Sequence, residues 1–133
     1  MDSTRADLTQ AVLEGVAFGM RDSLEAAKKL GVDVKTSMIC GGGAKSPLWK
    51  KIMANVLNIE LTIPETEQGP GYGGAILAAV ACGEFASTAE AVEKLVHVTE
   101  TVKPDPEIAA RYEKKYQAFR TLYPALKNCF PTL

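Results

Sequence analysis

Three consecutive glycines, Gly41–Gly43, lie between an apolar segment and a helical pattern, and they constrain the fold more than any other feature of the chain. Residues 34–40 before them are typical of a buried β-strand, and residues 47–57 after them carry apolar side chains at helical spacing. Glycines in such a turn can adopt backbone angles that are closed to other residues. Ser46 is a good helix N-cap, and Pro47 suits the first helical position. We therefore expect a strand, a glycine turn and a helix, in this order.

The glycine turn is also a candidate binding site for a phosphate-bearing or ribose-bearing ligand. Bare main-chain amides next to a helix N-terminus attract anions. The pattern is not a Walker A loop, because Ala44 stands where GxxxxGK[ST] needs glycine, and it is not the GxGxxG fingerprint. The candidate contact residues are Gly41, Gly42, Gly43, Ala44, Lys45 and Ser46. Two alternatives stay open: Lys45 could meet a phosphate or lie in solvent, and the glycines could serve only close packing of the helix on the sheet.

Composition narrows the class of protein. With 133 residues, 47% of them hydrophobic, the chain can form one domain with a core. Its 15 basic and 16 acidic residues nearly cancel, which argues against a nucleic acid partner. The three cysteines are widely spaced and suggest neither a zinc site nor a disulfide framework, so we expect a reduced, cytoplasmic setting. We also expect no membrane partner, because the longest small apolar run, Ala75–Cys82, is too short to cross a bilayer and no leader opens the chain.

The first element should be a long helix over residues 3–30, ended by Gly31. The residues expected on its packing stripe are Leu8, Ala11, Val12, Gly15, Gly19, Leu24, Ala27 and Leu30. Gly15 and Gly19 lower helix propensity, so we expect another element to approach the backbone closely there.

A β-α-β unit follows. Ile59, Leu61 and Ile63 alternate with polar residues and predict a half-buried strand that Pro64 ends. With the strand at 34–40 and the helix at 47–57, this predicts two parallel strands joined by a right-handed crossover. Ligands of such sheets bind outside the carboxyl ends of the strands, where the glycine turn lies.

The rest of the chain is predicted to form helices. The pattern predicts helices over residues 72–82 and 87–95, and a third that starts at Pro106, carries an aromatic stripe and is kinked or ended by Pro124. The sequence thus predicts two strands and five helices. Two parallel strands alone do not form a stable sheet, because the edges of a parallel sheet need neighbouring elements. We therefore expect sequence outside this chain, or a partner, to complete the sheet; a second copy of the chain, giving a homodimer, is one such partner.

Three motifs, in their order and spacing, resemble the C-terminal part of the FGGY carbohydrate kinases, most of all the members that act on xylulose. They are the helix before the glycine turn (Thr4–Leu8 and Ala11–Phe18), the adenosine-contact loop and its helix (Gly41–Ser46, Trp49 and Ile52–Leu57) and a glycine-alanine helix (Glu67–Ala75, Ala78 and Ala79). The resemblance covers nearly the whole chain. It departs from the family at Asn55, where many members carry Asp.

The resemblance implies an α/β fold of the actin-like ATPase (ribonuclease H-like) type, with a parallel βαβ core and several covering helices. Two domains of that fold close over sugar and ATP. Residues 1–133 would be the incomplete C-terminal nucleotide-binding domain, with the sugar-binding domain absent. On this mapping Gly42, Gly43 and Ala44 lie against the ribose and α-phosphate, with Lys45 and Ser46 beside the adenosine.

The resemblance further implies an ATP-dependent carbohydrate kinase that transfers the γ-phosphate to a sugar hydroxyl, with D-xylulose as the sugar and Mg²⁺ bound with the nucleotide. The family's aspartate base is not recognisable here, so no catalytic residue and no metal ligand is predicted, and the chain alone should be inactive. His97, the only histidine, has no partner motif that would make it catalytic.

A different class stays open: a non-catalytic binding or assembly module with packing glycines. Titration with ATP or ADP discriminates the two classes, because it should perturb the amides of Gly41 to Ser46 only in the kinase class. Gly43→Val is expected to abolish that response and leave the fold largely intact.

Overall fold

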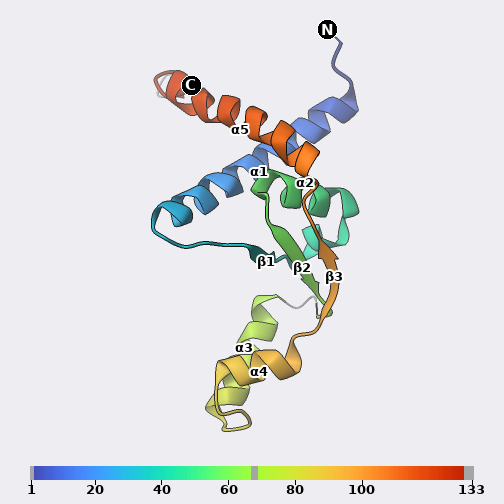
Figure 1. Cartoon of the computed structure of the whole chain (residues 1–133), viewed down its shortest axis with the longest axis vertical. Helices are drawn as coiled ribbons and strands as arrows, with labels where there is room; N and C mark the ends of the chain where they lie inside the picture. The colour runs from blue at the N-terminus through green and yellow to red at the C-terminus, as the bar shows by residue number, and fades with distance from the viewer. Residues whose placement is uncertain (1, 67–68, 131–133) are drawn as a thin grey trace.

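The computed structural model describes residues 2–66 and 69–130, which form three tiers (Figure 1). Three helices lie at one end, a small sheet lies in the middle, and two further helices project from the other end. The elements are α1 (Arg5–Lys29), β1 (Thr36–Met38), a 3₁₀ helix η1 (Gly42–Lys45), α2 (Pro47–Leu57), β2 (Glu60–Pro64), α3 (Pro70–Ala81), α4 (Thr88–Leu95), β3 (Val98–Val102) and α5 (Pro106–Leu126). Within the described ranges, no helix has both the length and the apolar character needed to cross a membrane.

The ends of the predicted helices follow their capping signals. Thr4 caps α1 in a reciprocal capping box with Asp7, and Gly31 follows the helix with a φ of 86°. Asp105 caps α5 by accepting from the amides of Glu107 and Ile108. Pro124 does not end α5 where the sequence predicts, since the helix continues to Leu126. A proline this close to the C-terminus lies within the last turn, where little helix remains to be disrupted.

The sheet contains the predicted parallel pair and one strand that the sequence analysis missed. Its order is β1-β2-β3; β1 pairs with β2 in parallel, with Ser37 opposite Leu61, which confirms the β-α-β prediction. Strand β3 pairs with β2 in the antiparallel direction, with Thr62 opposite Thr101. The sequence of β3, Val-Thr-Glu-Thr-Val, is short, polar and largely exposed, so it lacks the apolar signal of a core strand.

The strand predicted at 34–40 is present, but it is shorter than predicted, and the prediction that it is buried is wrong. Only Thr36–Met38 form β1, and all three residues are exposed. The strand lies at an edge of the sheet, and within the described residues neither its free edge nor its faces are covered. The apolar residues around it therefore reach only a partly buried position, as Val34 and Ile39 do.

The core lies where α1, α2 and α5 meet the sheet. It consists of Ala17, Phe18, Ile52, Met53, Ala54, Val56, Leu57, Ile59, Leu61, Tyr112 and Tyr116. Of the packing stripe predicted for α1, Leu24 packs against the core, but the N-terminal part is wrong in phase. Leu8 and Val12 are 63% and 67% exposed, whereas Ala17 and Phe18, which lie away from them around the helix, are buried. The predicted stripe is apolar too, and sequence periodicity does not rank two apolar faces of one helix.

Polar contacts tie α2 to the elements around it. The Oδ1 atom of Asn55 accepts a hydrogen bond from the amide of Asp105 at 2.7 Å, which fixes the start of α5 on α2. An aspartate at this position would present an equivalent acceptor, so the departure from the family pattern at Asn55 preserves this contact. Lys50 is buried and forms an ion pair with Glu100 on β3.

A hydrogen-bonded network joins α1 to α5 around Glu14. Its carboxylate accepts from Tyr112 Oη at 3.0 Å, from Gln10 Nε2 at 2.8 Å and from Lys115 Nζ at 3.0 Å. Burial raises the pKa of Glu14, but the hydrogen bonds from Gln10, Lys115 and Tyr112 outweigh it, and the pKa lies below its ordinary value of 4.5. Burial, and then the contact with Glu14, raises the pKa of Tyr112 to about 12.

Alkaline pH should weaken this junction. Burial, and then a 2.6 Å hydrogen bond to Asp22, also raises the pKa of Tyr116 to about 12, from 10.0. Both phenols hold their protons to higher pH in the folded chain, so their contribution is present below pH 10 and lost as the pH rises through 12. We expect the free energy of unfolding, measured with urea, to fall across that interval. A Tyr112→Phe/Tyr116→Phe variant should lose this decline; an equal decline in the variant would assign it to other groups.

Candidate functional site

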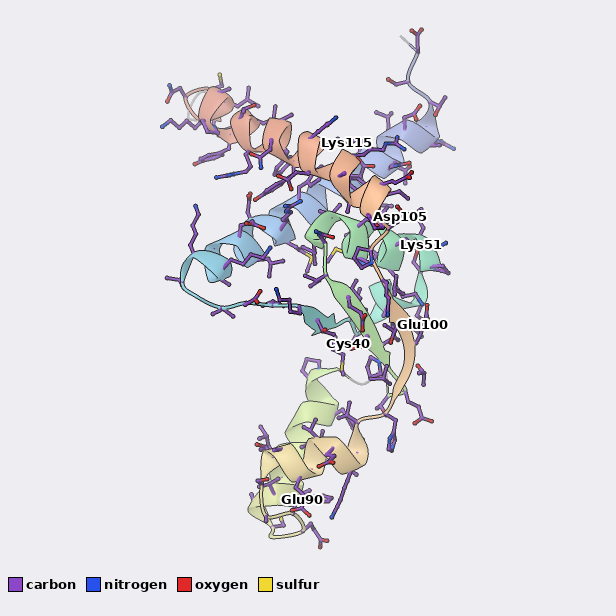
Figure 2. All side chains as sticks on the ribbon, viewed as in Figure 1. Cys40, Lys51, Glu90, Glu100, Asp105 and Lys115 are labelled. Carbon is purple, nitrogen blue, oxygen red and sulfur yellow. The ribbon has the colours of Figure 1, made fainter. Side chains whose placement is uncertain are left out.

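The glycine turn lies between β1 and α2, on the side where the parallel strands β1 and β2 end (Figure 1). Cys40, the last residue before the turn, lies between the sheet and the start of α3 (Figure 2). Its Sγ atom would be 3.8 Å from a Cβ atom placed on Gly69. The turn and the first residues of α3 therefore converge at the same end of the sheet, as expected for a ligand site of a parallel β-α-β unit.

The turn folds into a 3₁₀ helix, which uses some of its amides internally. The amide of Ala44 donates to Gly41 O at 3.0 Å, and the amide of Ser46 donates to Gly43 O at 3.1 Å. Among the described residues, the amides of Gly42 and Gly43 have no acceptor. These two neighbouring donors are the ones that a ligand oxygen could use.

The three glycines of the turn differ in what requires a glycine at their position. Gly41 has a φ of 80°, a conformation that favours glycine. A Cβ atom on Gly43 would lie 2.9 Å from Cδ1 and Nε1 of the Trp49 indole. A Cβ atom on Gly42 would meet nothing within 4 Å, and its φ is not in the left-handed region. Close packing therefore accounts for Gly43, and local backbone geometry for Gly41, but the described part of the chain gives no packing reason for Gly42.

This contact corrects the expectation that Gly43→Val leaves the fold largely intact. Trp49 is half-buried and packs against the core, so the valine would have to displace an anchored ring. If that variant lost ligand binding, the displacement of Trp49 would contribute to the loss as well as the blocked turn.

The start of α2 is built as the sequence predicts. The Ser46 side chain accepts from the amide of Trp49 at 3.2 Å, and Pro47 occupies the first turn. At the other end, Asn58 adopts the left-handed conformation that closes the helix. The buried Ala44 anchors the turn, while Lys45 and Ser46 are exposed. No acidic residue lies between Cys40 and Trp49, so the local charge favours an anion.

A shallow apolar pocket of about 190 Å³ lies between the strand ends and α3. Its lining residues are Met38, Cys40, Pro64, Thr66, Gly69, Tyr72, Gly73, Ile76 and Val96. The start of α3 belongs to the third motif of the sequence analysis, but Met38 and Val96 belong to no motif and were not predicted to lie here. Glu67 and Gln68, part of the third motif, lie outside the described residues.

Metal-binding side chains do not gather in the described ranges 2–66 and 69–130, where no group of three His, Cys, Asp or Glu residues could hold an ion. The turn itself offers main-chain amides, one lysine and one serine. Such a site can bind and orient an anionic ligand.

A family model and many curated proteins match this chain in sequence. The model for the "FGGY family of carbohydrate kinases, C-terminal domain" matches residues 1–82. A xylulose kinase of Staphylococcus epidermidis is 33% identical over 94% of this chain and 25% of its own length. An L-xylulose/3-keto-L-gulonate kinase of Escherichia coli is 35% identical over 94% of this chain and 25% of its length.

Solved structures of sugar kinases also match the fold of this chain. The crystal structure of a xylulose kinase from Rhodospirillum rubrum has a TM-score of 0.84 and 31% identity, covering 98% of this chain and 26% of that one. A gluconate kinase from Lactobacillus acidophilus, at 23% identity, shares the fold with a TM-score of 0.83 over 95% of this chain and 26% of that one. This chain spans about a quarter of the length of the curated relatives it matches.

Proposed function

This chain belongs to the FGGY family of carbohydrate kinases, and on that basis we propose that it holds the nucleoside end of ATP within the C-terminal nucleotide-binding domain of a sugar kinase. FGGY sugar kinases have an actin-like ATPase fold, and the β1-α2-β2 unit with its neighbouring helices is part of that fold. The rest of the nucleotide-binding domain and the whole sugar-binding domain would be supplied by sequence outside these residues.

The observation that carries the proposal is the open space at Gly42. A glycine that neither a left-handed φ nor a neighbouring atom requires leaves room for something outside the described chain. The adjacent amides of Gly42 and Gly43 would donate to an α-phosphate or ribose oxygen, with Ala44 packing against the ribose. Lys45 and Ser46 would lie beside the adenosine.

In the whole protein the reaction would be transfer of the ATP γ-phosphoryl group to a sugar hydroxyl. The relatives' names favour xylulose as the sugar, and the D form is our proposal. The turn would position the nucleotide for in-line attack, and a base outside this chain would accept the hydroxyl proton. The described residues offer no side-chain cluster for Mg²⁺, so the ion would enter with the nucleotide. We place this activity in the cytoplasm, where Cys40 and Cys82 would remain thiols.

Titration of the chain with ATP and with ADP tests the proposal. Trp49 is the only tryptophan and lies against Gly43, so its fluorescence should change as the turn fills. The amide resonances of Gly41 to Ser46 should shift with the same apparent Kd. Nucleotide that leaves both signals unchanged would contradict the proposed role, as would phosphorylation of D-xylulose by this chain alone.

A further inference from the structure

The two open amides of the glycine turn lie in a segment with little internal structure. Two main-chain hydrogen bonds close the turn, from Ala44 to Gly41 and from Ser46 to Gly43. Neither bond involves the amide of Gly42 or that of Gly43. Glycine has more backbone freedom than any other residue, so three in a row can sample many conformations. A contact from outside the turn is needed to keep these two amides in one arrangement.

The indole ring of Trp49 supplies that contact. A Cβ atom on Gly43 would lie 2.9 Å from both Cδ1 and Nε1 of the ring, so the ring occupies the place that a side chain of Gly43 would take. A Cβ atom on Gly41 or Gly42 would meet nothing within 4 Å. Of these three glycines, only Gly43 therefore has a neighbour at its Cβ position among the described residues, and that neighbour is one side chain.

Trp49 is itself held by the rest of the molecule. It is half-buried on α2 and packs against the core. The next residue, Lys50, is buried and forms an ion pair with Glu100, which fixes the start of α2 on β3. The amide of Trp49 donates to the Ser46 side chain at 3.2 Å, so its main chain meets the last residue of the turn while its ring meets Gly43. A side chain that a packed helix anchors can hold a loop more precisely than contacts within the loop.

The ring and the open space of the site belong to different residues of the turn. The ring takes the Cβ position of Gly43, whereas the Cβ position of Gly42 is empty. A ligand that enters at Gly42 therefore leaves the contact between Trp49 and Gly43 in place. The indole can support the turn before and after a ligand binds.

We propose that Trp49 is a positioning residue: its ring, packed on Gly43, holds the unliganded turn in the conformation in which the amides of Gly42 and Gly43 donate together to a phosphate or ribose oxygen. The glycines are then ordered before the ligand arrives, and binding does not have to offset the entropy of ordering them. The effect on affinity rests on the proposed nucleotide-binding function of the turn, whereas the order of the unliganded turn does not depend on it.

Backbone nitrogen relaxation of the unliganded chain tests the order of the turn. We expect order parameters of about 0.85 at Gly42 and Gly43 in the unmodified chain, and values below about 0.6 in Trp49→Ala. Trp49→Phe keeps an aromatic ring with a Cδ1 atom and should retain the order. The matched control is Phe119→Ala, which removes an aromatic ring that packs against the same core from α5 and should leave the turn unchanged.

Two outcomes of the relaxation measurement would overturn the proposal. One is a turn that is already flexible in the unmodified chain, and the other is equal order in the unmodified chain and in Trp49→Ala. Urea denaturation shows whether each variant is folded. If Trp49→Ala is not, Trp49→Val takes its place, because valine also lacks the ring atoms that touch Gly43 but retains more apolar packing.

Affinity for ATP and ADP gives the second readout, measured by calorimetry because the variants lack the Trp49 fluorophore. Trp49→Ala should raise the Kd at least about tenfold, while Trp49→Phe and Phe119→Ala should leave it nearly unchanged. Equal affinity in Trp49→Ala and the unmodified chain would overturn the proposal. If the unmodified chain binds neither nucleotide, the proposed function fails, and the order parameters alone decide whether Trp49 holds the turn.

Alanine at Gly43 separates ordering of the turn from packing of the core. In the unmodified chain its methyl group would collide with the ring, so Gly43→Ala should weaken nucleotide binding. In the Trp49→Ala background the methyl group enters vacated space, and the φ of Gly43 is not left-handed, so alanine can adopt it. There Gly43→Ala should tighten binding about two- to fivefold, because alanine restricts the free backbone more than glycine. Unchanged or weaker binding in that background would contradict an ordering role for Trp49.

Discussion

Replacing Gly42 with valine is expected to weaken the binding of ATP and ADP at least about 100-fold while the chain keeps its fold. Two hydrogen bonds from main-chain amides to a charged phosphate contribute about 1.5–3 kcal/mol each when they are made, and the isopropyl group would hold the ligand away from both. The fold should tolerate the change because a Cβ atom on Gly42 meets nothing within 4 Å and its φ is not left-handed. Trp49 fluorescence and the amide shifts of Gly41 to Ser46 measure the loss.

Two comparisons make this result specific. Gly15→Val adds the same side chain at another open helical glycine, on α1, and should leave nucleotide affinity unchanged. Gly43→Val should lower both affinity and stability, because its Cβ atom would lie 2.9 Å from the Trp49 ring. If Gly42→Val binds ATP as tightly as the unmodified chain, the turn is a packing device and the nucleotide site lies elsewhere.

Replacing Tyr116 with alanine should have the largest effect on folding, a loss of about 3–5 kcal/mol in the free energy of unfolding. Tyr116 is 1% exposed and contacts elements far apart in sequence: its ring lies 6.0 Å from that of Phe18, and the Arg21 guanidinium lies 4.3 Å above it. Its hydroxyl donates to Asp22 at 2.6 Å. Natural domains have about 5–15 kcal/mol in total, so this loss would leave the chain at the limit of folding.

Urea denaturation followed by far-ultraviolet circular dichroism measures this change. Tyr123→Ala on the same helix is the matched control; Tyr123 is 68% exposed, and its loss should cost less than about 1 kcal/mol. Tyr116→Phe keeps the ring and removes the hydroxyl, so it should cost only about 0.5–1.5 kcal/mol. Equal losses for Tyr116→Ala and Tyr123→Ala would contradict the position of the core between α1 and α5.

Local sequence signals were sufficient where neighbouring residues decide the structure. The cap at Ser46, the left-handed closure at Gly31, the start of α5 at Pro106 and the parallel pairing of the strands around α2 are all present. The glycine turn was recognisable for the same reason, because its backbone conformation depends on the residues within it. Its role toward a nucleotide stays a prediction.

Contacts between distant segments decided the rest. Strand β3 forms because β2 offers it an edge, Asn55 reaches Asp105 fifty residues away, and the indole of Trp49 makes Gly43 sterically necessary. The choice between the two apolar faces of α1 also depends on which one α2 and α5 cover. The sequence alone determined which segments become helices, where they begin and end, and that the glycine turn follows a strand, because capping and periodicity act over a few residues. Only the tertiary structure decided which apolar surfaces are buried, because burial depends on partners that periodicity does not encode.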